Sequence, residues 1–423
     1  MTKAMMIRSG TAPGGLLELT VAEAAHGGWC VARSAAPGDQ GKVVFVRHAL
    51  PGERVRARVT SSTTRFTRAE AVEILQASPD RVEPPCGYAR PDGCGGCDLQ
   101  HARPAAQRAL KAQVIRQQLR RIAGIEREVT VEALPGDPAG LGWRTRVGFA
   151  VGPDGTAGLR KHRSHQVVAV AGCPIAHPLV RAADVTGRRW PGARGVEVTV
   201  SPGSGERSVA VSGPARGAGG KPRPWLTQHA AGRTWRVSAG VFWQVHPAAA
   251  GVLTEAVLAA VGPGPGDVAL DLYCGAGLFI GALATAVGSA GRVTGVESDV
   301  AAVRDARKNL AGFPQVRVHR GDAARVLAQR GLGGARLAVL DPPRTGAGRQ
   351  LVELLAAPGE LRRIGYVSCD PATLARDLAV FAGRGWRLED LRAFDAFPMT
   401  HHVECVATLA PTSVSPATSG RGG

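Results

Sequence analysis

One stretch decides the fold of the chain: Val268-Ala-Leu-Asp271-Leu-Tyr273-Cys274-Gly275-Ala276-Gly277-Leu278-Phe279. Residues 268–272 are apolar apart from one aspartate, which predicts a buried strand. The glycines that follow predict a tight turn into a helix, and they let the backbone approach a bound nucleotide. Position 280 is Ile rather than Gly, so the dinucleotide-binding fingerprint is absent. The sequence therefore predicts an α/β domain with a ligand at the carboxyl end of this strand.

Four further strands are expected after this turn, and each ends in or just before a side chain that can do chemistry. Those side chains are Glu297, Asp322, Asp341 and Cys369. The carboxylate of Glu297 can accept both hydroxyls of a ribose, and Asp322 is placed to meet an adenine amine. Parallel strands bring their carboxyl ends to one edge of a sheet, so we expect these side chains to share a cleft.

The cysteine lies in the segment Tyr366-Val367-Ser368-Cys369-Asp370-Pro371 and admits two interpretations. A lone cysteine at the end of a strand is more often packed and inert. At the edge where α/β sheets keep their active sites, it could instead be a nucleophile. The segment alone leaves both interpretations open.

The chain is strongly basic, with a formal net charge of +18 over 423 residues. Only six of its 52 basic residues are Lys, and Arg binds phosphate through a planar fork. This balance indicates a polyanion as partner, either nucleic acid or an anionic surface, unless the arginines reflect a compositional bias alone. No apolar run is long enough to span a bilayer, and the N-terminus lacks a secretory signal pattern. We therefore expect a cytoplasmic protein without a membrane segment.

Residues 11–76 predict a small closed β-barrel. Five short strands separated by turns fit the OB type, which is a common platform for nucleic acid. Residues 54–59 alternate strictly and place arginines on one face. Residues 28–33 and 51–55 resemble the TRAM domain, an RNA-binding barrel attached to RNA-modifying enzymes.

Four cysteines outside the α/β domain form a candidate metal site: Cys86, Cys94, Cys97 and Cys173. The first three lie within twelve residues, with glycines between them, so their loop can wrap a soft metal. Four thiolates suit either tetrahedral zinc or an iron–sulfur cluster, and the spacing does not choose between them.

Together these segments resemble the RNA uracil-C5 methyltransferases, which use S-adenosylmethionine to make 5-methyluridine in bacterial tRNA and rRNA. The resemblance covers nearly the whole chain. It is carried by Phe242-Trp-Gln244-Val, Asp271-Leu-Tyr-Cys-Gly-x-Gly, Asp341-Pro-Pro-Arg-x-Gly, Ser368-Cys369-Asp370-Pro371 and Phe397-Pro-x-Thr-x-His402-x-Glu404.

The resemblance implies a role for each candidate residue. Cys369 would be the nucleophile and Glu404 the base. S-adenosylmethionine would be held by Gln244, Tyr273, Gly275, Gly277, Glu297, Asp322 and Asp341. The four cysteines would hold a 4Fe-4S cluster, with zinc as the alternative.

The chemistry of the family requires a thiolate and a base. Uracil C5 is a poor nucleophile, and addition of a thiolate at C6 turns the ring into an enolate that can attack a methyl sulfonium. A base must then remove the C5 proton so that the thiolate can leave. We expect Arg344 to favour the thiolate, and the target base to be flipped out of its RNA stack.

The expected architecture has three parts and a tail. A Rossmann-like α/β methyltransferase domain with a mostly parallel, seven-stranded sheet is expected over residues 241–410. A small α+β domain with the cysteine site should span residues 77–240, and its helix 103–123 can pack on the catalytic domain. Residues 411–423 are expected to be a disordered tail, and the protein is expected to be a monomer that binds RNA without an obligate protein partner.

Three positions depart from the family pattern, and three other functions compete. Seven residues separate Cys86 from Cys94, Leu278 stands where Asn is frequent, and so does Asp370.

The competing functions are an RNA cytosine-C5 methyltransferase, a radical enzyme that modifies RNA, and a non-catalytic RNA-binding protein on the same scaffold. The Glu404 motif argues against the first, and the cysteine spacing argues against the second.

Overall fold

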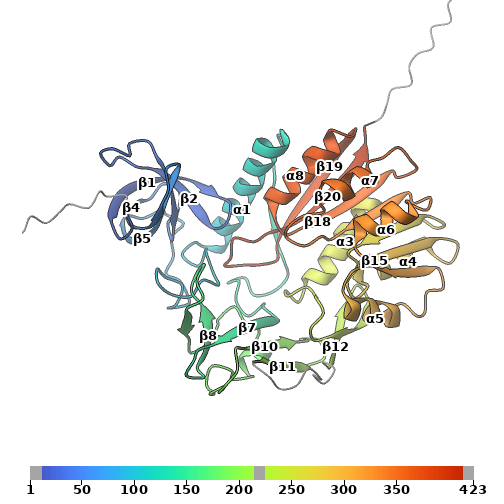
Figure 1. Ribbon diagram of the computed structural model, residues 1–423, viewed down its shortest axis with the longest axis horizontal. Helices are drawn as coiled ribbons and strands as arrows, with labels where there is room; N and C mark the ends of the chain where they lie inside the picture. The colour runs from blue at the N-terminus through green and yellow to red at the C-terminus, as the bar shows by residue number, and fades with distance from the viewer. Residues whose placement is uncertain (1–11, 214–223, 413–423) are drawn as a thin grey trace, which may run out of the picture.

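The structure is a computed structural model, and it describes residues 12–213 and 224–412. Figure 1 shows a barrel at the N-terminal end, a central β unit and a larger α/β unit at the C-terminal end. The barrel closes in the strand order β1–β2–β3–β5–β4. Its strands are β1 Leu16–Ala25, β2 Trp29–Arg33, β3 Val43–Arg47, β4 Arg54–Ser62 and β5 Phe66–Gln76. Alternate residues of β1 are buried, so every second side chain points into the barrel and fills its interior. The predicted OB-type fold is confirmed.

The central unit is an antiparallel sheet of five strands in the order β11–β10–β7–β8–β9. Its strands are β7 Arg146–Val151, β8 Ala157–Arg160, β9 Val167–Ala169, β10 Gly195–Val200 and β11 Arg207–Ser212. A short helix, α2 (Pro178–Arg181), and a separate hairpin, β12 Trp225–Ala230 with β13 Arg233–Ser238, complete this region. Residues 212–224 are rich in Gly, Pro and Ser, a composition that predicts a loop, and most of them lie outside the described residues.

One helix joins the barrel to the α/β unit. It is α1 (Pro104–Gln118), which continues into a single π-helical turn over Leu119–Ala123. Ile115 and Leu119 are buried in the core that α1 shares with the α/β unit. On its other side, Gln117 donates a hydrogen bond of 2.7 Å to Glu23 of the barrel. The helix therefore lies between the barrel and the α/β unit, as Figure 1 shows.

The α/β unit is built on a sheet of eight strands, in the order β16–β15–β14–β17–β18–β20–β19–β6. The strands are β14 Val268–Leu272, β15 Arg292–Glu297, β16 Val316–Arg320, β17 Leu337–Leu340, β18 Arg363–Ser368, β19 Trp386–Asp395, β20 Glu404–Pro411 and β6 Val131–Ala133. The first five are parallel, and β20 runs antiparallel to β18. The predicted Rossmann-like fold is thus confirmed.

Residues 241–410 supply seven strands of this sheet, the number predicted, and one more strand joins from outside that range. The additional strand, β6, pairs in parallel with β19 and comes from the range expected to form the central domain. Three residues carry too little patterning to be recognised as a strand. Strand β20 includes Pro411, so it enters the expected tail, whose residues 413–423 lie outside the described residues.

Helices cover both faces of this sheet. They are α3 Ala249–Val261, α4 Leu278–Val287, α5 Val300–Asn309, α6 Ala323–Arg330, α7 Arg349–Leu355 and α8 Pro371–Ala382. The first three share a core on one face, whereas α6, α7, α8 and α1 share a core on the other. Strand order reverses between β14 and β17, which places a crevice at their carboxyl ends. In the described ranges, no helix has the length and apolar character needed to cross a membrane.

Candidate active site

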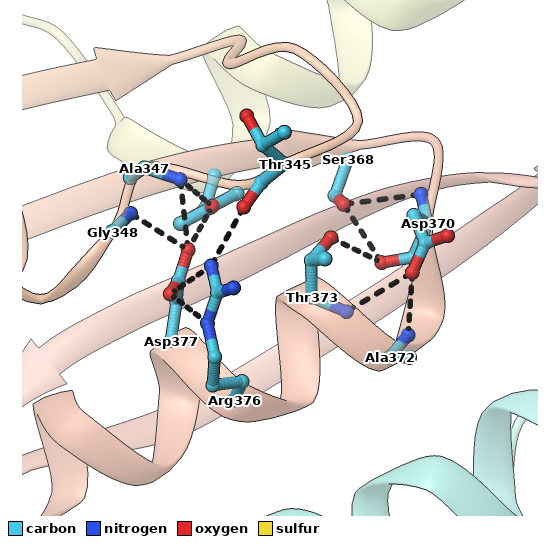
Figure 2. A network of polar contacts seen from close by, with 10 residues as sticks. Thr345, Ala347, Gly348, Ser368, Asp370, Ala372, Thr373, Arg376 and Asp377 are labelled. Atoms are coloured by element: carbon cyan, nitrogen blue, oxygen red, sulfur yellow. Dashed lines mark hydrogen bonds and ion pairs between the residues drawn. The ribbon is translucent and has the colours of Figure 1, made fainter.

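The nucleophile candidate lies in the turn between β18 and α8. Pro371 is the first helical residue, and the Asp370 side chain accepts hydrogen bonds from the backbone N–H groups of Ala372 and Thr373, at 2.9 and 3.0 Å. This cap fixes the start of α8. The Asp370 N–H donates to the hydroxyl of Ser368 at 3.3 Å, and that hydroxyl donates to the Asp370 carbonyl at 3.1 Å (Figure 2). Cys369 therefore lies between two residues that are joined by the Ser368 hydroxyl and the Asp370 backbone.

Glu404 lies opposite Cys369 across the sheet. The antiparallel pairing of β18 with β20 ends with Ser368 opposite Cys405. Continuing this register by one residue pairs Cys369 with Glu404. Cβ atoms of directly opposed residues are about 4.5–5.5 Å apart, so the thiol and the carboxyl share one small space. The sequence places these residues 35 positions apart, and the hairpin of β19 and β20 brings them together.

Burial makes both groups hard to ionise. The pKa of the Cys369 thiol is raised to about 12, mainly by burial and then by Glu404 and Asp341, while Arg344 opposes the rise. Burial also raises the pKa of the Glu404 carboxyl well above its ordinary value, with Asp341 as the second cause. Asp341, at the end of β17, has its own pKa raised to about 7 by burial. Three acidic groups thus share one buried space, and the guanidinium of Arg344 is the cation that opposes them.

The loop that carries Asp341 and Arg344 is fastened to α8. Figure 2 shows the carboxylate of Asp377 accepting hydrogen bonds from the N–H groups of Ala347, at 2.8 Å, and Gly348, at 3.4 Å. The hydroxyl of Tyr366 donates to the same carboxylate at 2.7 Å. Asp377 is fully buried, so it fixes the loop from below.

Gly346 allows this loop to lie so close to α8. Its φ of +78° favours glycine, and a Cβ at this position would lie 2.6 Å from a carboxylate oxygen of Asp377. At the exposed end of the loop, Arg344 contacts Nε2 of His402 at 3.1 Å. Since an arginine can only donate, Nε2 of His402 accepts this hydrogen bond and the ring is neutral.

The predicted cofactor residues surround the end of β14. Gly275 and Gly277 have φ of +53° and +104°, and Tyr273 also has a positive φ, of 71°. The N–H of Gly275 donates to the carboxylate of Glu297 at 3.0 Å, which ties the glycine turn to the end of β15. Asp322 and Glu297 both raise the pKa of the Tyr273 hydroxyl, after burial as the main cause. These strand ends therefore lie close together, as predicted.

One buried carboxylate in this region lacks a well-formed hydrogen bond. Both side-chain oxygens of Asp271 are fully buried, and among the described residues only the nearby backbone N–H of Ile280 acts to lower the pKa of the group. Burial raises the pKa of Asp271 well above its ordinary value, with Asp341 as the second cause. Asp341 acts on Asp271, Glu404 and Cys369 alike, so it lies between the cofactor end and the nucleophile. A buried acceptor without a well-formed hydrogen bond fits a ligand that brings a donor.

Two predicted cofactor residues have local roles in the structure. Asp322 is exposed and caps α6 by accepting the Arg325 N–H at 3.0 Å. Gln244 is buried in the segment that leads into α3, and its assignment rests on the family motif.

The four predicted metal ligands line one small cavity. Cys86, Cys94, Cys97 and Cys173 surround a cavity of about 50 Å³ with mainly apolar walls. Burial raises the pKa of Cys94, Cys97 and Cys173. The N–H of Gly96 donates to the Cys94 sulfur at 3.3 Å. No three His, Cys, Asp or Glu side chains of residues 12–213 and 224–412 are arranged to hold a metal ion as they stand.

Comparison with known proteins assigns the family. Residues 335–411 match the family described as tRNA (uracil-5-)-methyltransferase, and residues 12–72 match the TRAM domain. A 23S rRNA (uracil(1939)-C(5))-methyltransferase of Pseudomonas putida is 34% identical, over 87% of this chain and 88% of its own. The chain belongs to the RNA uracil-C5 methyltransferase family. Members of this family depend on S-adenosylmethionine, so the predicted enzyme class is confirmed.

Two further relatives of this methyltransferase cover nearly the whole chain. A Streptomyces avermitilis protein described as an uncharacterized RNA methyltransferase is 49% identical, over 94% of this chain and 98% of its own. The solved structure of Pyrococcus abyssi tRNA (uracil-54, C5)-methyltransferase, in complex with S-adenosyl-L-homocysteine, matches with a TM-score of 0.69. It covers 93% of this chain and 99% of its own at 23% identity, which shows the common fold.

Several residues of the site were missed by sequence reasoning. Asp377 is a single acidic residue inside a helix, and its pattern gives no hint of the loop it holds. Asp98 follows Cys97 directly and accepts a hydrogen bond from Nδ1 of His401 at 2.5 Å. His26 lies in the barrel, and only the tertiary structure brings it to Asp370.

Proposed function

We propose that this methyltransferase adds a methyl group to C5 of a uridine in rRNA or tRNA, with Cys369 as nucleophile and Glu404 as base. The observation that carries the proposal is the register of β18 and β20, which ends with Ser368 opposite Cys405 and so brings the next residues, Cys369 and Glu404, close enough for Glu404 to raise the thiol pKa. A thiol and a carboxyl on neighbouring strands can act on the two adjacent ring carbons of one uracil.

The reaction assigns one bond change to each residue. The Cys369 sulfur adds to C6, and the ring becomes an enolate with electron density at C5. S-adenosylmethionine, when bound, supplies the electrophilic methyl group that C5 takes up. Glu404 removes the proton from C5, the C5–C6 double bond forms again, and the Cys369 thiolate leaves C6.

The electrostatics of the site support these roles. A carboxylate whose pKa burial has raised is a stronger base once it is ionised. Arg344 lowers the pKa of both Cys369 and Glu404, so it favours the two reactive forms. Asp341 lies between them and the cofactor end, where it can orient the uracil.

The residues around β14 fit the cofactor. The buried carboxylate of Asp271 would accept hydrogen bonds from the ammonium group of S-adenosylmethionine. Glu297 would bind the ribose, and Tyr273 and Asp322 would border the adenine. The Gly275–Gly277 turn leaves room for the ligand to approach the backbone.

The four cysteines are proposed to hold a 4Fe-4S cluster, with zinc as the alternative. Four thiols around one cavity are the donor set that a cluster takes, and an N–H bond to a ligand sulfur tunes such centres. A single Zn²⁺ would require four sulfurs about 2.3 Å from one point, an arrangement that these side chains would reach only by moving.

The printed activities of the relatives guide the choice of RNA. The Pseudomonas enzyme acts on 23S rRNA and the Pyrococcus enzyme on tRNA. The bacterial relative matches at the higher identity, so 23S rRNA is the first substrate to test.

The roles of the two residues are tested by Cys369→Ala and Glu404→Gln, with methyl incorporation into 23S rRNA and tRNA transcripts as the measurement. Cys369→Ala should abolish methylation, whereas Cys30→Ala, which removes a buried barrel thiol, should retain it. Glu404→Gln should accumulate a covalent RNA adduct, seen as a retarded band on a denaturing gel, while the control Glu389→Gln, a half-buried carboxylate of β19 paired with Arg363 and Arg387, should not. Methylation that persists in Cys369→Ala would overturn the proposal.

A further inference from the structure

The RNA-binding barrel reaches into the catalytic site through the turn between β1 and β2. Nε2 of His26, in that turn, lies 3.3 Å from a carboxylate oxygen of Asp370, the neighbour of the nucleophile. The side chains are 37% and 23% exposed, so the contact lines the cleft without filling it. A contact between residues 344 positions apart in the chain joins two units of different function.

The turn is held in place by contacts other than this one. Gly28 has a φ of +78°, and a Cβ there would lie 2.7 Å from the Cβ of Asp98, so the turn packs tightly on the cysteine loop. Asp98 also accepts a hydrogen bond of 3.2 Å from the buried guanidinium of Arg47. The docking of the barrel is therefore secured by buried contacts, and the half-exposed pair of His26 and Asp370 is not needed for it.

Asp370 uses its two carboxylate oxygens for different partners. Oδ1 caps α8 through the N–H groups of Ala372 and Thr373, whereas Oδ2 faces His26. A hydrogen bond donated by His26 to Oδ2 holds the carboxylate in one orientation. Because the backbone of Asp370 is tied to Ser368, that orientation extends to the turn that carries Cys369 (Figure 2).

We propose that His26 is a positioning residue for methyl transfer: it holds Asp370, and through Asp370 it aims the Cys369 sulfur at uracil C6. The inference rests on the proposed function of Cys369. It gives the barrel a second role, because the unit that binds RNA also orders the turn that attacks it. Asp370 is required for this device, since a carboxylate accepts from an imidazole more strongly than an amide does.

The test compares His26→Ala, His26→Gln and His165→Ala with the wild-type protein. Gln retains an N–H donor of similar reach, and His165 is an exposed histidine between β8 and β9. The substrates are 23S rRNA and tRNA transcripts, and the same transcripts with 5-fluorouridine in place of uridine. Fluorine cannot be removed as a proton, so the Cys369 adduct persists and its rate of formation reports the attack.

His26→Ala should lower kcat and the rate of adduct formation by about threefold to tenfold, the range expected for one partly exposed hydrogen bond to a charged group. The KM for RNA should be unchanged, His26→Gln should recover most of the loss, and His165→Ala should match the wild type. An unchanged adduct rate in His26→Ala, a change in KM alone, or a His26→Gln variant no faster than His26→Ala would each overturn the inference. If the wild-type protein itself forms no adduct, the proposed function fails, which is a distinct result.

Discussion

At the scale of single residues, the site is a cluster of acids around one arginine. Burial raises the pKa values of Cys369, Glu404 and Asp341, and Arg344 lowers those of the first two. The reactive thiolate and carboxylate form only as protons leave, so each requires a pH above its raised pKa or help from a neighbouring cation. The guanidinium is in turn oriented by the neutral ring of His402.

The pH dependence of the reaction follows from this cluster. We expect kcat/KM to rise with pH up to the raised pKa of the Cys369 thiol, because deprotonated forms are the active ones. Arg344→Met should raise the pKa of the thiol further and move this rise to higher pH, by roughly one unit, which is tenfold in activity at a fixed pH below the rise. Methylation assays across the pH range would measure it, with Arg349→Met on the exposed side of α7 as the control. A profile that does not move would show that Arg344 leaves the thiol unaffected.

At this scale, the sequence predicts the catalytic candidates better than it predicts the residues that they contact. Cys369 and Glu404 stand out because each belongs to a motif at the edge of a strand. Their direct opposition depends on the register of an antiparallel pair, and register cannot be read from spacing. His26 has no motif around it, so its contact with Asp370 arises only from the docking of the barrel.

At the scale of elements, the loop between β17 and α7 sets the geometry of the site. It carries Asp341 and Arg344, and the buried carboxylate of Asp377 fastens its far end to α8. The nucleophile turn begins that same helix. Helix α8 therefore fixes the positions of both the loop with Asp341 and Arg344 and the turn with Cys369.

Two glycines of this loop allow the effect of steric crowding to be measured apart from the effect of backbone strain. Gly346 and Gly348 have nearly equal φ, +78° and +79°, but only a Cβ on Gly346 would meet another atom within 4 Å. Gly346→Ala should lower kcat and destabilise the fold by about 1–3 kcal/mol more than Gly348→Ala, which carries the strain alone. Chemical denaturation together with methylation assays would measure both. Equal effects of the two variants would mean that crowding against Arg376 and Asp377 does not matter.

The helix α1 shows where patterning fails. Its periodicity predicts an apolar face that includes Ile115 and Ile122, and the structure buries the first while leaving the second 41% exposed. Instead, the polar residues Gln107, Lys111 and Gln117 are buried. A helix between two units meets polar partners on both sides, and a one-face pattern cannot anticipate them.

At the scale of the whole molecule, a buried ion pair joins α1 to the catalytic sheet. Nζ of Lys111 lies 2.6 Å from Oδ1 of Asp395, with side chains 1% and 4% exposed, and it also donates to the Phe397 carbonyl at 3.1 Å. The last residues of β19 and the loop that leads to Glu404 therefore depend on a lysine from another unit.

Removal of this lysine should be costly. Lys111→Met leaves Asp395 buried without its partner, and we expect a loss of about 3–5 kcal/mol in the free energy of unfolding. Arg103→Ala, which breaks the exposed pair of the same helix with Asp80, should change it little. Denaturant titration of both variants would decide, and equal stabilities would show that the buried pair contributes nothing.

The cysteine cavity lies at a junction between units. The N–H groups of Asp98 and Leu99 donate to the Met399 carbonyl, and Gly95 donates to Arg160. The proposed cluster would thus stiffen contacts between the central sheet and the loop before Glu404.

The identity of the metal centre is open to direct measurement. Anaerobically purified protein should absorb broadly in the visible, Cys97→Ser should lose this absorption, and Cys30→Ser should retain it. A colourless protein containing stoichiometric zinc would replace the cluster by a Zn²⁺ site.

The sequence predicts the large architecture because alternation and strand ends are local signals. The barrel and the parallel strands of the α/β unit follow from such signals. The boundaries of the units at residues 76 and 240 stay a prediction. The strand at residues 131–133 is too short to be recognised from the sequence. It belongs to the catalytic sheet although it lies before residue 240, so the sheet extends beyond the predicted catalytic domain.

This small strand has a consequence for how the protein can be made. β6 covers the outer edge of β19, yet it leaves the ribosome more than 250 residues before β19 does. The segment that becomes β6 therefore has no strand to pair with until synthesis is nearly complete. The last hairpin, β19 and β20, then provides both the pairing strand for β6 and the Glu404 side of the active site. A fragment beginning at residue 241 would carry both proposed catalytic residues but leave a bare strand edge, which we expect to pair with other copies and aggregate.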